Sequence, residues 1–239
     1  KEIYTLFENV DVVFHLAAKN DLRACDADPV ETVDINIRGT ANVFEAARLG
    51  GVKKVAYASS SAVEEGEKRL NGMYAMSKAT GERIAASYRE GFGLASVCLR
   101  YFNVYGPRQD YRRAAPPVIS KFIISILTGE RPILFANDDR NKRDFVYIDD
   151  VATAFCLALE TSYVGPVNIG TGKETSLGEV AYAIAKDGNT TIAIKDGYPP
   201  TRMQAGIGRA KRILGWGPKV DIWEGLRAVL EYEKSAVLS

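Results

Sequence analysis

The sequence predicts an α/β fold, in which a mostly parallel sheet is covered by helices on both faces. Three short apolar segments, 10–18, 53–60 and 94–106, have the length and the β-branched composition of buried strands. Two helix-sized segments, 29–51 and 73–90, separate them. This alternation is typical of parallel βαβ units, and strands that are apolar along almost their whole length fit a sheet with both faces covered.

Each of these elements carries its own start or stop signals. The first strand, VDVVFHLAA at 10–18, ends in small residues. The first helix opens at Pro29, repeats apolar residues at helical spacing and stops at the LGG of 49–51. The second helix, 73–90, contains few helix breakers and is followed by the glycine-containing stretch 91–93.

The pattern loosens after residue 106. The elements expected there are, in order, a polar loop (107–117), a helix (118–127), a charged loop (136–144), a short strand running into a helix (145–160), a strand (165–172), a helix (175–186) and a last amphipathic helix (223–234). The helix at 175–186 has a clear N-terminal signal, because Glu179 follows Ser176 by three residues, which is the spacing of a capping box.

Composition and charge exclude several classes of protein. The 239 residues are enough for one large domain or for a domain with a smaller companion. The 31 Lys and Arg residues nearly balance the 30 Asp and Glu residues, so we expect no nucleic-acid or anionic-membrane surface. Three distant cysteines and a single histidine predict neither a disulfide framework nor a metal site. We therefore expect a cytoplasmic protein without a metal.

One expected motif is missing from the start of the sequence. A doubly wound fold that binds a dinucleotide has a glycine-rich turn between its first strand and its first helix. No such turn lies near the start, and GTGKETS at 170–176 lacks the spacing of a phosphate-binding loop. We expect about two βαβ units, roughly 60 residues, before the first strand. They are either absent from the chain or outside the sequence given.

Three serines and a Tyr-x-x-x-Lys pair suggest a chemistry. Tyr74 and Lys78 are four residues apart in a predicted helix and so share one face. A nearby ammonium lowers the pKa of a phenol, which makes Tyr74 a candidate general base toward an alcohol. The serines 59–61 end a predicted parallel strand, on the side where such sheets bind ligands. Removing a proton from an alcohol beside a hydride acceptor is the chemistry of nicotinamide-dependent oxidation.

Each feature also has an ordinary structural explanation. A Tyr-x-x-x-Lys pair on an exposed helix face arises often by chance, and serines at the end of a strand commonly form turns. The combination of both features in one βα unit is more specific than either feature alone.

Four further motifs accompany the serines and the Tyr-x-x-x-Lys pair: HLAA (15–18), NIRGT (36–40), LRYFNVYGPRQ (99–109) and RDFVYIDDVATA (143–154). With them the sequence resembles a known family, the extended short-chain dehydrogenase/reductases, and within it the NAD-dependent nucleotide-sugar epimerases and dehydratases. The motifs occur in the same order as in the family and cover nearly the whole chain. The resemblance implies bound NAD and a Rossmann-type doubly wound sheet with a smaller C-terminal substrate-binding subdomain.

The resemblance assigns roles in the cofactor half. Tyr74 is the expected base, and Lys78 is expected to bind the nicotinamide ribose. Ser60 is the expected active hydroxyl, with Ser61 as the alternative because the triple serine allows a slip of one residue. The residues expected at the dinucleotide are Leu16, Ala17, Ala18, Asn36, Ser59, Tyr74, Lys78, Tyr101, Asn103 and Val104. For Asn36, a structural hydrogen bond from its helix to a neighbouring loop is an equal alternative.

The resemblance also predicts a substrate half. The backbone of Val118 is expected at the nucleotide base, and Arg143 at the diphosphate, because a guanidinium pairs bidentately with phosphate oxygens. Arg202 is a weaker second candidate, since the Arg-x-Gly-Asp run usual in the family is missing from its region. Ser60, Ser61 and Asn103 complete the expected substrate contacts. For Arg143, a salt bridge to a neighbouring carboxylate is an equal alternative. The loop 63–73 also departs from the family, because it is short and lacks the usual Tyr-Gly.

These assignments define the domains and the activity that we expect. Residues 1–106 form the dinucleotide-binding part, to which 145–170 return, and 107–144 and 171–239 form the sugar-nucleotide part. The leading activity is epimerisation at C4 of a UDP-sugar. A 4,6-dehydratase has an Asp-Glu pair where this chain has Ser61-Ala62, which argues against dehydration. A decarboxylase, a reductase and a non-catalytic binding protein stay open. Helices 29–50 and 73–90 are expected to form a homodimer interface.

Overall fold

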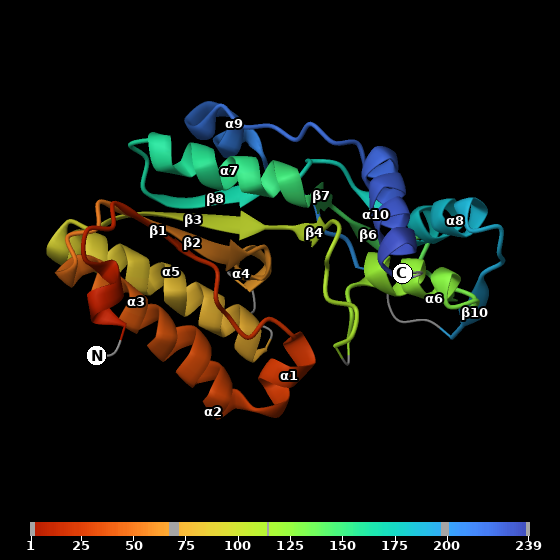
Figure 1. Cartoon of the computed structure of the whole chain (residues 1–239), viewed down its shortest axis with the longest axis horizontal. Coiled ribbons are helices and arrows are strands. Elements are labelled where there is room, and N and C mark those ends of the chain that lie inside the picture. The colour runs from red at the N-terminus through yellow and green to blue at the C-terminus, as the bar shows by residue number, and fades with distance from the viewer. Residues whose placement is uncertain (1–2, 67–71, 114, 197–200, 238–239) are drawn as a thin grey trace. The chain divides into compact units, whose positions relative to one another are not determined.

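The computed structural model describes residues 3–66, 72–113, 115–196 and 201–237. The chain forms two compact units (Figure 1). The first unit consists of Lys1–Tyr101, Thr153–Ile169 and Gly208–Trp216, and the second unit of Phe102–Ala152, Gly170–Ile207 and Gly217–Ser239. The two units are described separately below.

The first unit is built on a parallel sheet of four strands in the order β1-β2-β3-β8. The strands are β1 (Val12–His15), β2 (Lys54–Ser60), β3 (Ala95–Tyr101) and β8 (Gly165–Ile169). The register pairs Ser60 with Tyr101, and Tyr101 with Ile169, so three strands end at the same edge. This sheet confirms the predicted α/β fold with parallel strands.

Helices cover both faces of this sheet (Figure 1). On one face α3 and α5 lie side by side, and α7 and α9 lie on the other. The helical elements of this unit are η1 (Tyr4–Phe7), α1 (Leu22–Ala27), α2 (Pro29–Thr32), the π-helical η2 (Val33–Arg38), α3 (Gly39–Leu49), α4 (Ala62–Gly66), α5 (Met73–Phe92), part of α7 (Ile148–Glu160) and α9 (Gly208–Leu214). The core under α3 and α5 contains Phe44, Ala47, Val52, Val55, Tyr57, Ala85, Leu94 and Cys98.

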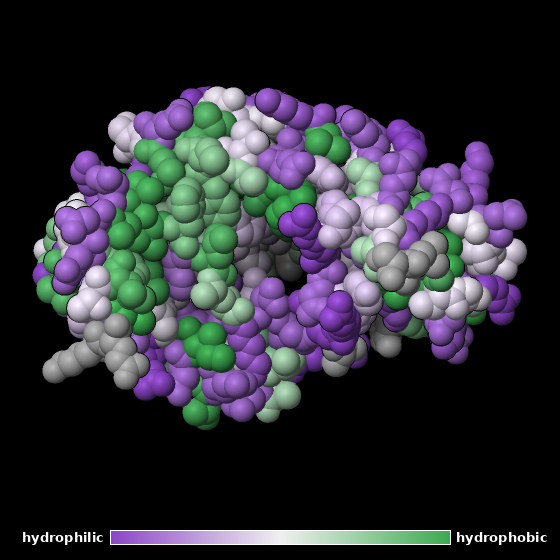
Figure 2. Space-filling view, viewed as in Figure 1, coloured by the Kyte–Doolittle hydropathy of each residue, from purple (hydrophilic) through white to green (hydrophobic). Residues whose placement is uncertain are grey.

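Part of the first unit's surface is apolar. On the face shown in Figure 2, hydrophobic side chains gather over the first unit. Two of the exposed large apolar residues, Phe14 (44% exposed) and Leu16 (58%), lie in β1 and directly after it. The carboxyl end of β1 and the loop that follows it therefore reach the surface.

Two predicted strands have different limits in the structure. The first ends at His15, not at residue 18, because Asn36 hydrogen-bonds the backbone N–H and C=O of Lys19 and so draws the chain away from the sheet. The apolar run 94–106 is two strands, β3 and β4, divided at Phe102. β3 pairs with β2 and β8, whereas β4 pairs with a strand of the second unit, so continuous apolarity hides a change of sheet.

In its described residues the second unit contains three pairs of short strands and, besides the start of α7, three helices. β4 (Asn103–Tyr105) pairs with β7 (Phe145–Tyr147), and β5 (Ile133–Phe135) with β10 (Ala193–Lys195), both in parallel; β6 (Lys142–Arg143) pairs antiparallel with β9 (Thr175–Ser176). The helices are α6 (Val118–Leu127), α8 (Leu177–Asp187) and α10 (Ile222–Val237). The predicted capping box of α8 is confirmed: Ser176 Oγ accepts from Glu179 N–H at 3.0 Å, and the Glu179 carboxylate accepts from Ser176 N–H at 2.8 Å.

The predicted domain division and the two units differ at three segments. Residues 102–106 and 145–152 group with the second unit, and residues 208–216 group with the first unit. In α9, Ala210 and Leu214 are buried, and Arg209 donates a hydrogen bond to the backbone oxygen of Pro166 at 3.0 Å. Burial against β8 therefore decides the position of this segment.

Among the described residues, none of the helices is both long and apolar enough to cross a lipid bilayer.

Candidate active site

The helix α5 presents Tyr74, Lys78 and Glu82 at intervals of four residues, which places the three side chains on one face. The start of α5 is fixed by Asp26 of α1, whose carboxylate accepts a hydrogen bond from Met73 N–H at 2.8 Å. Gly72 precedes it at φ +91°, a conformation that other residues rarely adopt, with the Asp26 carboxylate 3.0 Å from the position of a Cβ. A glycine is therefore required directly before α5, two residues ahead of the predicted base Tyr74.

Lys78 is a buried cation. Only 3% of the residue is exposed, and its ammonium donates to the backbone oxygen of Ala58 in β2 at 2.7 Å. The nitrogen lies 5.2 Å from the ring centre of Tyr57 and 5.9 Å from that of Tyr74. Burial lowers the pKa of Lys78 to about 8, because the charged form loses its hydration. At neutral pH the ammonium is still largely protonated.

The three serines at the end of β2 have different environments. Ser59 Oγ donates to Glu82 Oε1 at 2.5 Å, on the face of the sheet covered by α5. Ser60 is half-buried, and its Oγ accepts from Ala62 N–H at 3.2 Å, which leaves its own proton to be donated. Ser61 is buried and its N–H extends the pairing with β3 by donating to Tyr101 O at 2.8 Å.

Asn36 ties the loop after β1 to two helices. It lies in the π-helical η2 and is 1% exposed. Its Oδ1 accepts from Lys19 N–H at 2.8 Å, and its Nδ2 donates to Lys19 O at 2.9 Å and to Ser77 Oγ of α5 at 3.0 Å. The amide hydrogens of Asn36 are thus both used within the protein. Asn36 holds the loop of Leu16, Ala17 and Ala18, in which the first two residues are exposed.

His15 was considered in the sequence only as a possible metal ligand, and the structure places it beside Lys78. It is 6% exposed, and its Nε2 is 2.9 Å from Thr40 Oγ1. Burial, together with the charge of Lys78, lowers the pKa of His15 to about 4, so the imidazole is neutral at physiological pH. Its position in the sequence could have indicated this role. His15 ends a predicted strand, and the carboxyl ends of parallel strands, here those of His15 and of the serines 59–61, lie at the same edge of a sheet.

Tyr101 provides a test for a bound cofactor. Its hydroxyl is buried and makes no hydrogen bond within the part of the chain that the structure describes. Burial, with a smaller effect of Tyr74, raises the pKa of this phenol well above its ordinary value. Buried polar groups in proteins nearly always have partners. An unpaired donor at the carboxyl end of β3 fits a site whose remaining partner is a bound molecule.

The other predicted contacts lie in the second unit. Asn103 is held by its backbone N–H and its Nδ2, which both donate to the backbone oxygen of Asp144, at 3.0 and 3.1 Å. Val104 follows it in β4 and is half-buried. Val118 opens α6, where the backbone N–H groups of a first helical turn have no partner within the helix.

The two candidate arginines do not lie on one face. Arg143 donates to Thr201 O at 3.0 Å and to Thr201 Oγ1 at 2.6 Å. Arg202 forms an ion pair with Glu174. Lys142 and Arg202 are direct bridge partners and so share a face, whereas Arg143, the next residue along β6, points to the opposite one. The structure therefore does not bring the two arginines together.

Comparison with known proteins identifies the family. The model of the NAD dependent epimerase/dehydratase family matches residues 1–170. The chain belongs to the NAD-dependent epimerase/dehydratase family. NAD is the cofactor of this family, and the buried donors of Lys78 and Tyr101 fit such a group.

Relatives of this epimerase/dehydratase family member extend along almost its whole length. It is 36% identical over 244 residues to a putative UDP-glucose 4-epimerase of Methanocaldococcus jannaschii, covering 96% of this chain and 79% of that protein. A UDP-N-acetylglucosamine 4-epimerase of Methanobrevibacter ruminantium, solved with UDP-N-acetylmuramic acid, has a TM-score of 0.91 at 31% identity, with 99% and 80% of the two chains covered. A UDP-glucose 4-epimerase of Thermus thermophilus, solved with NAD, has a TM-score of 0.83 at 34% identity, with 95% and 78% covered.

Proposed function

We propose that this protein epimerises a nucleotide sugar at C4, through a transient 4-keto intermediate, and that its substrate is a UDP-hexose or a UDP-N-acetylhexosamine. The observation that carries the proposal is the buried Lys78 ammonium 5.9 Å from the ring of Tyr74, beside the carboxyl end of β2. Bound NAD supplies the chemistry of taking a hydride from C4 and giving it back. The names of the related 4-epimerases support UDP as the carrier.

The side chains of the first unit perform the proton chemistry. Tyr74, as phenolate, takes the proton of the sugar 4-hydroxyl during oxidation and returns it during reduction, so no net proton is used. The Lys78 ammonium stabilises the phenolate by its charge. The Ser60 hydroxyl donates a hydrogen bond to the reacting oxygen, since its Oγ already accepts from Ala62 and its proton is left for a ligand.

Other residues shape the cofactor side of this site. The loop of Leu16, Ala17 and Ala18 borders the dinucleotide, and Asn36 fixes that loop through Lys19. In this proposal Asn36 acts through the loop, because its amide hydrogens are both used within the protein. The hydroxyl of Tyr101 donates to the bound molecule, and Ser59 acts from the helix side of the same strand.

The second unit contributes the sugar-nucleotide contacts. In the proposal, Asn103 and Val104 contact cofactor and sugar, Val118 offers its backbone to the nucleotide base, and Arg143 binds the diphosphate. Arg143 is half-buried and bound to the neutral Thr201, whose acceptors a phosphate group can replace. Arg202 is already paired with Glu174, so its contribution to phosphate binding is expected to be small.

We also propose that the protein is a homodimer. Large apolar side chains are exposed along α2, η2, α3 and α5, which are the helices expected at the interface. Among the described residues they are Val30 (75% exposed), Val33 (38%), Ile35 (42%), Leu49 (55%) and Phe92 (60%). Covering them removes apolar area from water. Light scattering at micromolar concentration is expected to give the mass of a dimer, and a monomer would contradict the proposal.

Product analysis tests the function. The purified full-length protein is incubated with UDP-, GDP- and dTDP-sugars, and the products are separated by chromatography. We expect UDP-glucose or UDP-N-acetylglucosamine to be converted to its galacto epimer. Tyr74→Phe is expected to abolish turnover, and Tyr88→Phe is its matched control, since both variants remove one hydroxyl from α5 and the Tyr88 hydroxyl donates to Glu45 at 3.1 Å. Loss of water or carbon dioxide, or no turnover of any sugar, would overturn the proposal.

A further inference from the structure

Glu82 lies one turn beyond Lys78 on α5, and the two residues contact consecutive residues of β2. Lys78 donates to Ala58 O at 2.7 Å, and Glu82 accepts from Ser59 Oγ at 2.5 Å. The next residue of β2 is Ser60, the proposed reactive hydroxyl. The contact between Glu82 and Ser59 is therefore the last side-chain tie between α5 and β2 before the site.

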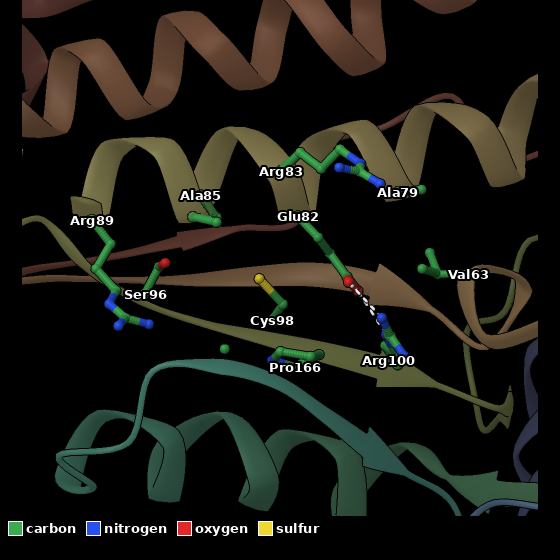
Figure 3. A pocket seen from close by; sticks show the side chains of 12 residues that line it. Val63, Ala79, Glu82, Arg83, Ala85, Arg89, Ser96, Cys98, Arg100 and Pro166 are labelled. Carbon is green, nitrogen blue, oxygen red and sulfur yellow. Dashed lines mark hydrogen bonds and ion pairs between the residues drawn. The ribbon is translucent and has the colours of Figure 1, made fainter. Parts of the chain in front are cut away.

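Glu82 also binds the neighbouring strand. Arg100 of β3 donates its Nε to Oε1 at 2.8 Å and an Nη to Oε2 at 2.7 Å, and each side chain of this pair is 12% exposed. Ser59 and Arg100 are direct partners in the register of β2 and β3. Figure 3 shows the pair in the lining of a cavity of about 460 Å³, between α5 and β3, with Arg89 and Ser96 on one side of the pair and Val63 and Ala79 on the other.

We propose that Glu82 is a positioning residue that selects Ser60, out of the three adjacent serines, as the reactive hydroxyl; this inference rests on the proposed function. Successive side chains of a strand point to opposite faces, and a slip of one residue exchanges the faces. By holding Ser59 against α5, the carboxylate fixes the face to which Ser60 points. Without this tie the end of β2 is held by its backbone pairing with β3, and a local twist there can present a neighbouring serine in place of Ser60.

The geometry favours positioning over an electrostatic effect on the base. The guanidinium of Arg100, in bidentate contact with Glu82, compensates the negative charge of its carboxylate. A lowered kcat with an unchanged pH dependence is therefore the expected signature of a Glu82 substitution. A carboxylate that acted by its charge would shift the pH profile of kcat instead.

The test compares Glu82→Ala, Glu82→Gln, Ser59→Ala and the double variant Ser59→Ala/Glu82→Ala in the full chain with UDP-glucose. We expect Glu82→Ala to lower kcat by about tenfold while KM changes by less than about twofold, because the hydrogen bond from Ser60 to the reacting oxygen stabilises the transition state more than it stabilises the bound substrate. Ser59→Ala should lower kcat as well, and the double variant should be no worse than Glu82→Ala, since both break one tie. Glu82→Gln keeps an acceptor for Ser59 and is expected to rescue most of the rate.

Glu45→Ala is the matched control, because it removes a carboxylate on α3 that binds Arg48 and the Tyr88 hydroxyl of α5. It is expected to lower Tm but to leave kcat unchanged. A second readout is amide exchange of Ala62, whose N–H bonds Ser60 Oγ. It should become faster in Glu82→Ala and Ser59→Ala, and stay as in the unmodified protein in the control.

Either of two results would overturn the inference. The first is that Glu82→Ala and Ser59→Ala, as single variants, both keep a kcat within twofold of the unmodified protein. The second is that Glu45→Ala loses as much kcat as Glu82→Ala does. If Glu82→Ala does not fold, the kcat values of Ser59→Ala and Glu82→Gln still test the inference. If the unmodified protein turns over no nucleotide sugar, the proposed function fails, while the exchange of Ala62 still tests the role of Glu82.

Discussion

Charged side chains lie beside the carboxyl end of β2 and beside the strand pair β6–β9, but the two regions hold them in opposite ways. At the end of β2, Lys78 is 3% exposed and hydrogen-bonded to the backbone. At β6–β9, the side chain of Arg202 is 67% exposed and pairs with Glu174. A buried charge interacts strongly because water does not screen it, whereas an ion pair with one exposed partner, such as Arg202, contributes little. The first arrangement suits proton chemistry at a fixed point, whereas the charge of Arg202 is already compensated by Glu174.

The largest effect is expected for the loss of the proposed base, which should abolish turnover and leave the affinity for the nucleotide sugar nearly unchanged. Tyr74→Phe removes the phenol oxygen and leaves Lys78 and the second unit in place. We expect kcat to fall by at least about a thousandfold, since the base is lost. The Kd of the nucleotide sugar, measured by calorimetry, should change by less than about threefold. Normal turnover by this variant would refute the assignment of the base.

Acid stability is expected to depend on the buried region. The folded-state pKa of His15, about 4, lies below its ordinary value of 6.5. Between these values the unfolded chain binds a proton that the folded chain does not, so stability is lost as the pH falls from 6.5 through 4. The loss attributable to His15 is up to about 3 kcal/mol.

This second prediction is measured by urea unfolding at several pH values, with His15→Gln as the comparison. Glutamine keeps a hydrogen-bonding group near Thr40 but does not titrate. The carboxylates titrate in both proteins, so the difference between them isolates His15. Equal losses in the two proteins would show that His15 is not buried in its neutral form.

Substrate binding should separate the two arginines. Arg143→Ala is expected to raise the KM of the nucleotide sugar by about ten- to fiftyfold with little change in kcat, because one charge-assisted phosphate contact is lost. Arg202→Ala should raise KM by less than about threefold, since its guanidinium is exposed and paired with Glu174. Steady-state kinetics measure both. Equal effects would contradict the separation of the two side chains onto opposite faces.

The pH dependence of kcat sharpens the account of Lys78. With a pKa of about 8, the ammonium loses its proton above that pH and no longer stabilises the phenolate. We expect kcat to fall by roughly tenfold per pH unit beyond this point. In Lys78→Arg the guanidinium stays charged, so the alkaline fall should disappear even if the rate is lower. An unchanged alkaline fall in that variant would assign it to another group.

Much of the fold could be predicted because local signals agreed with it. The apolar spacing of α6 gave its limits, Val118–Leu127, and the Ser176–Glu179 box marked the start of α8. The break at Phe102 could not be seen, because both flanking segments are apolar and the change of sheet depends on distant partners. The end of β1 at His15 likewise depends on Asn36.

The candidate site was predictable in part for the same reason. Tyr74 and Lys78 stand at a spacing that any helix places on one face. The contacts of Glu82 with Ser59, 23 residues away, and of His15 with Thr40, 25 residues away, are set by packing and leave no local pattern. The opposite faces of Arg143 and Arg202 follow from a strand register that the sequence does not mark.

The central claim is that the sugar is oxidised and reduced again at C4 within one site. Its most direct test is turnover of UDP-glucose that carries deuterium at C4, with the label in the product located by mass spectrometry and NMR. The account predicts that the galacto product keeps the deuterium at C4, because the hydride that leaves this carbon returns to it. Replacement of the label by hydrogen from water would contradict the account.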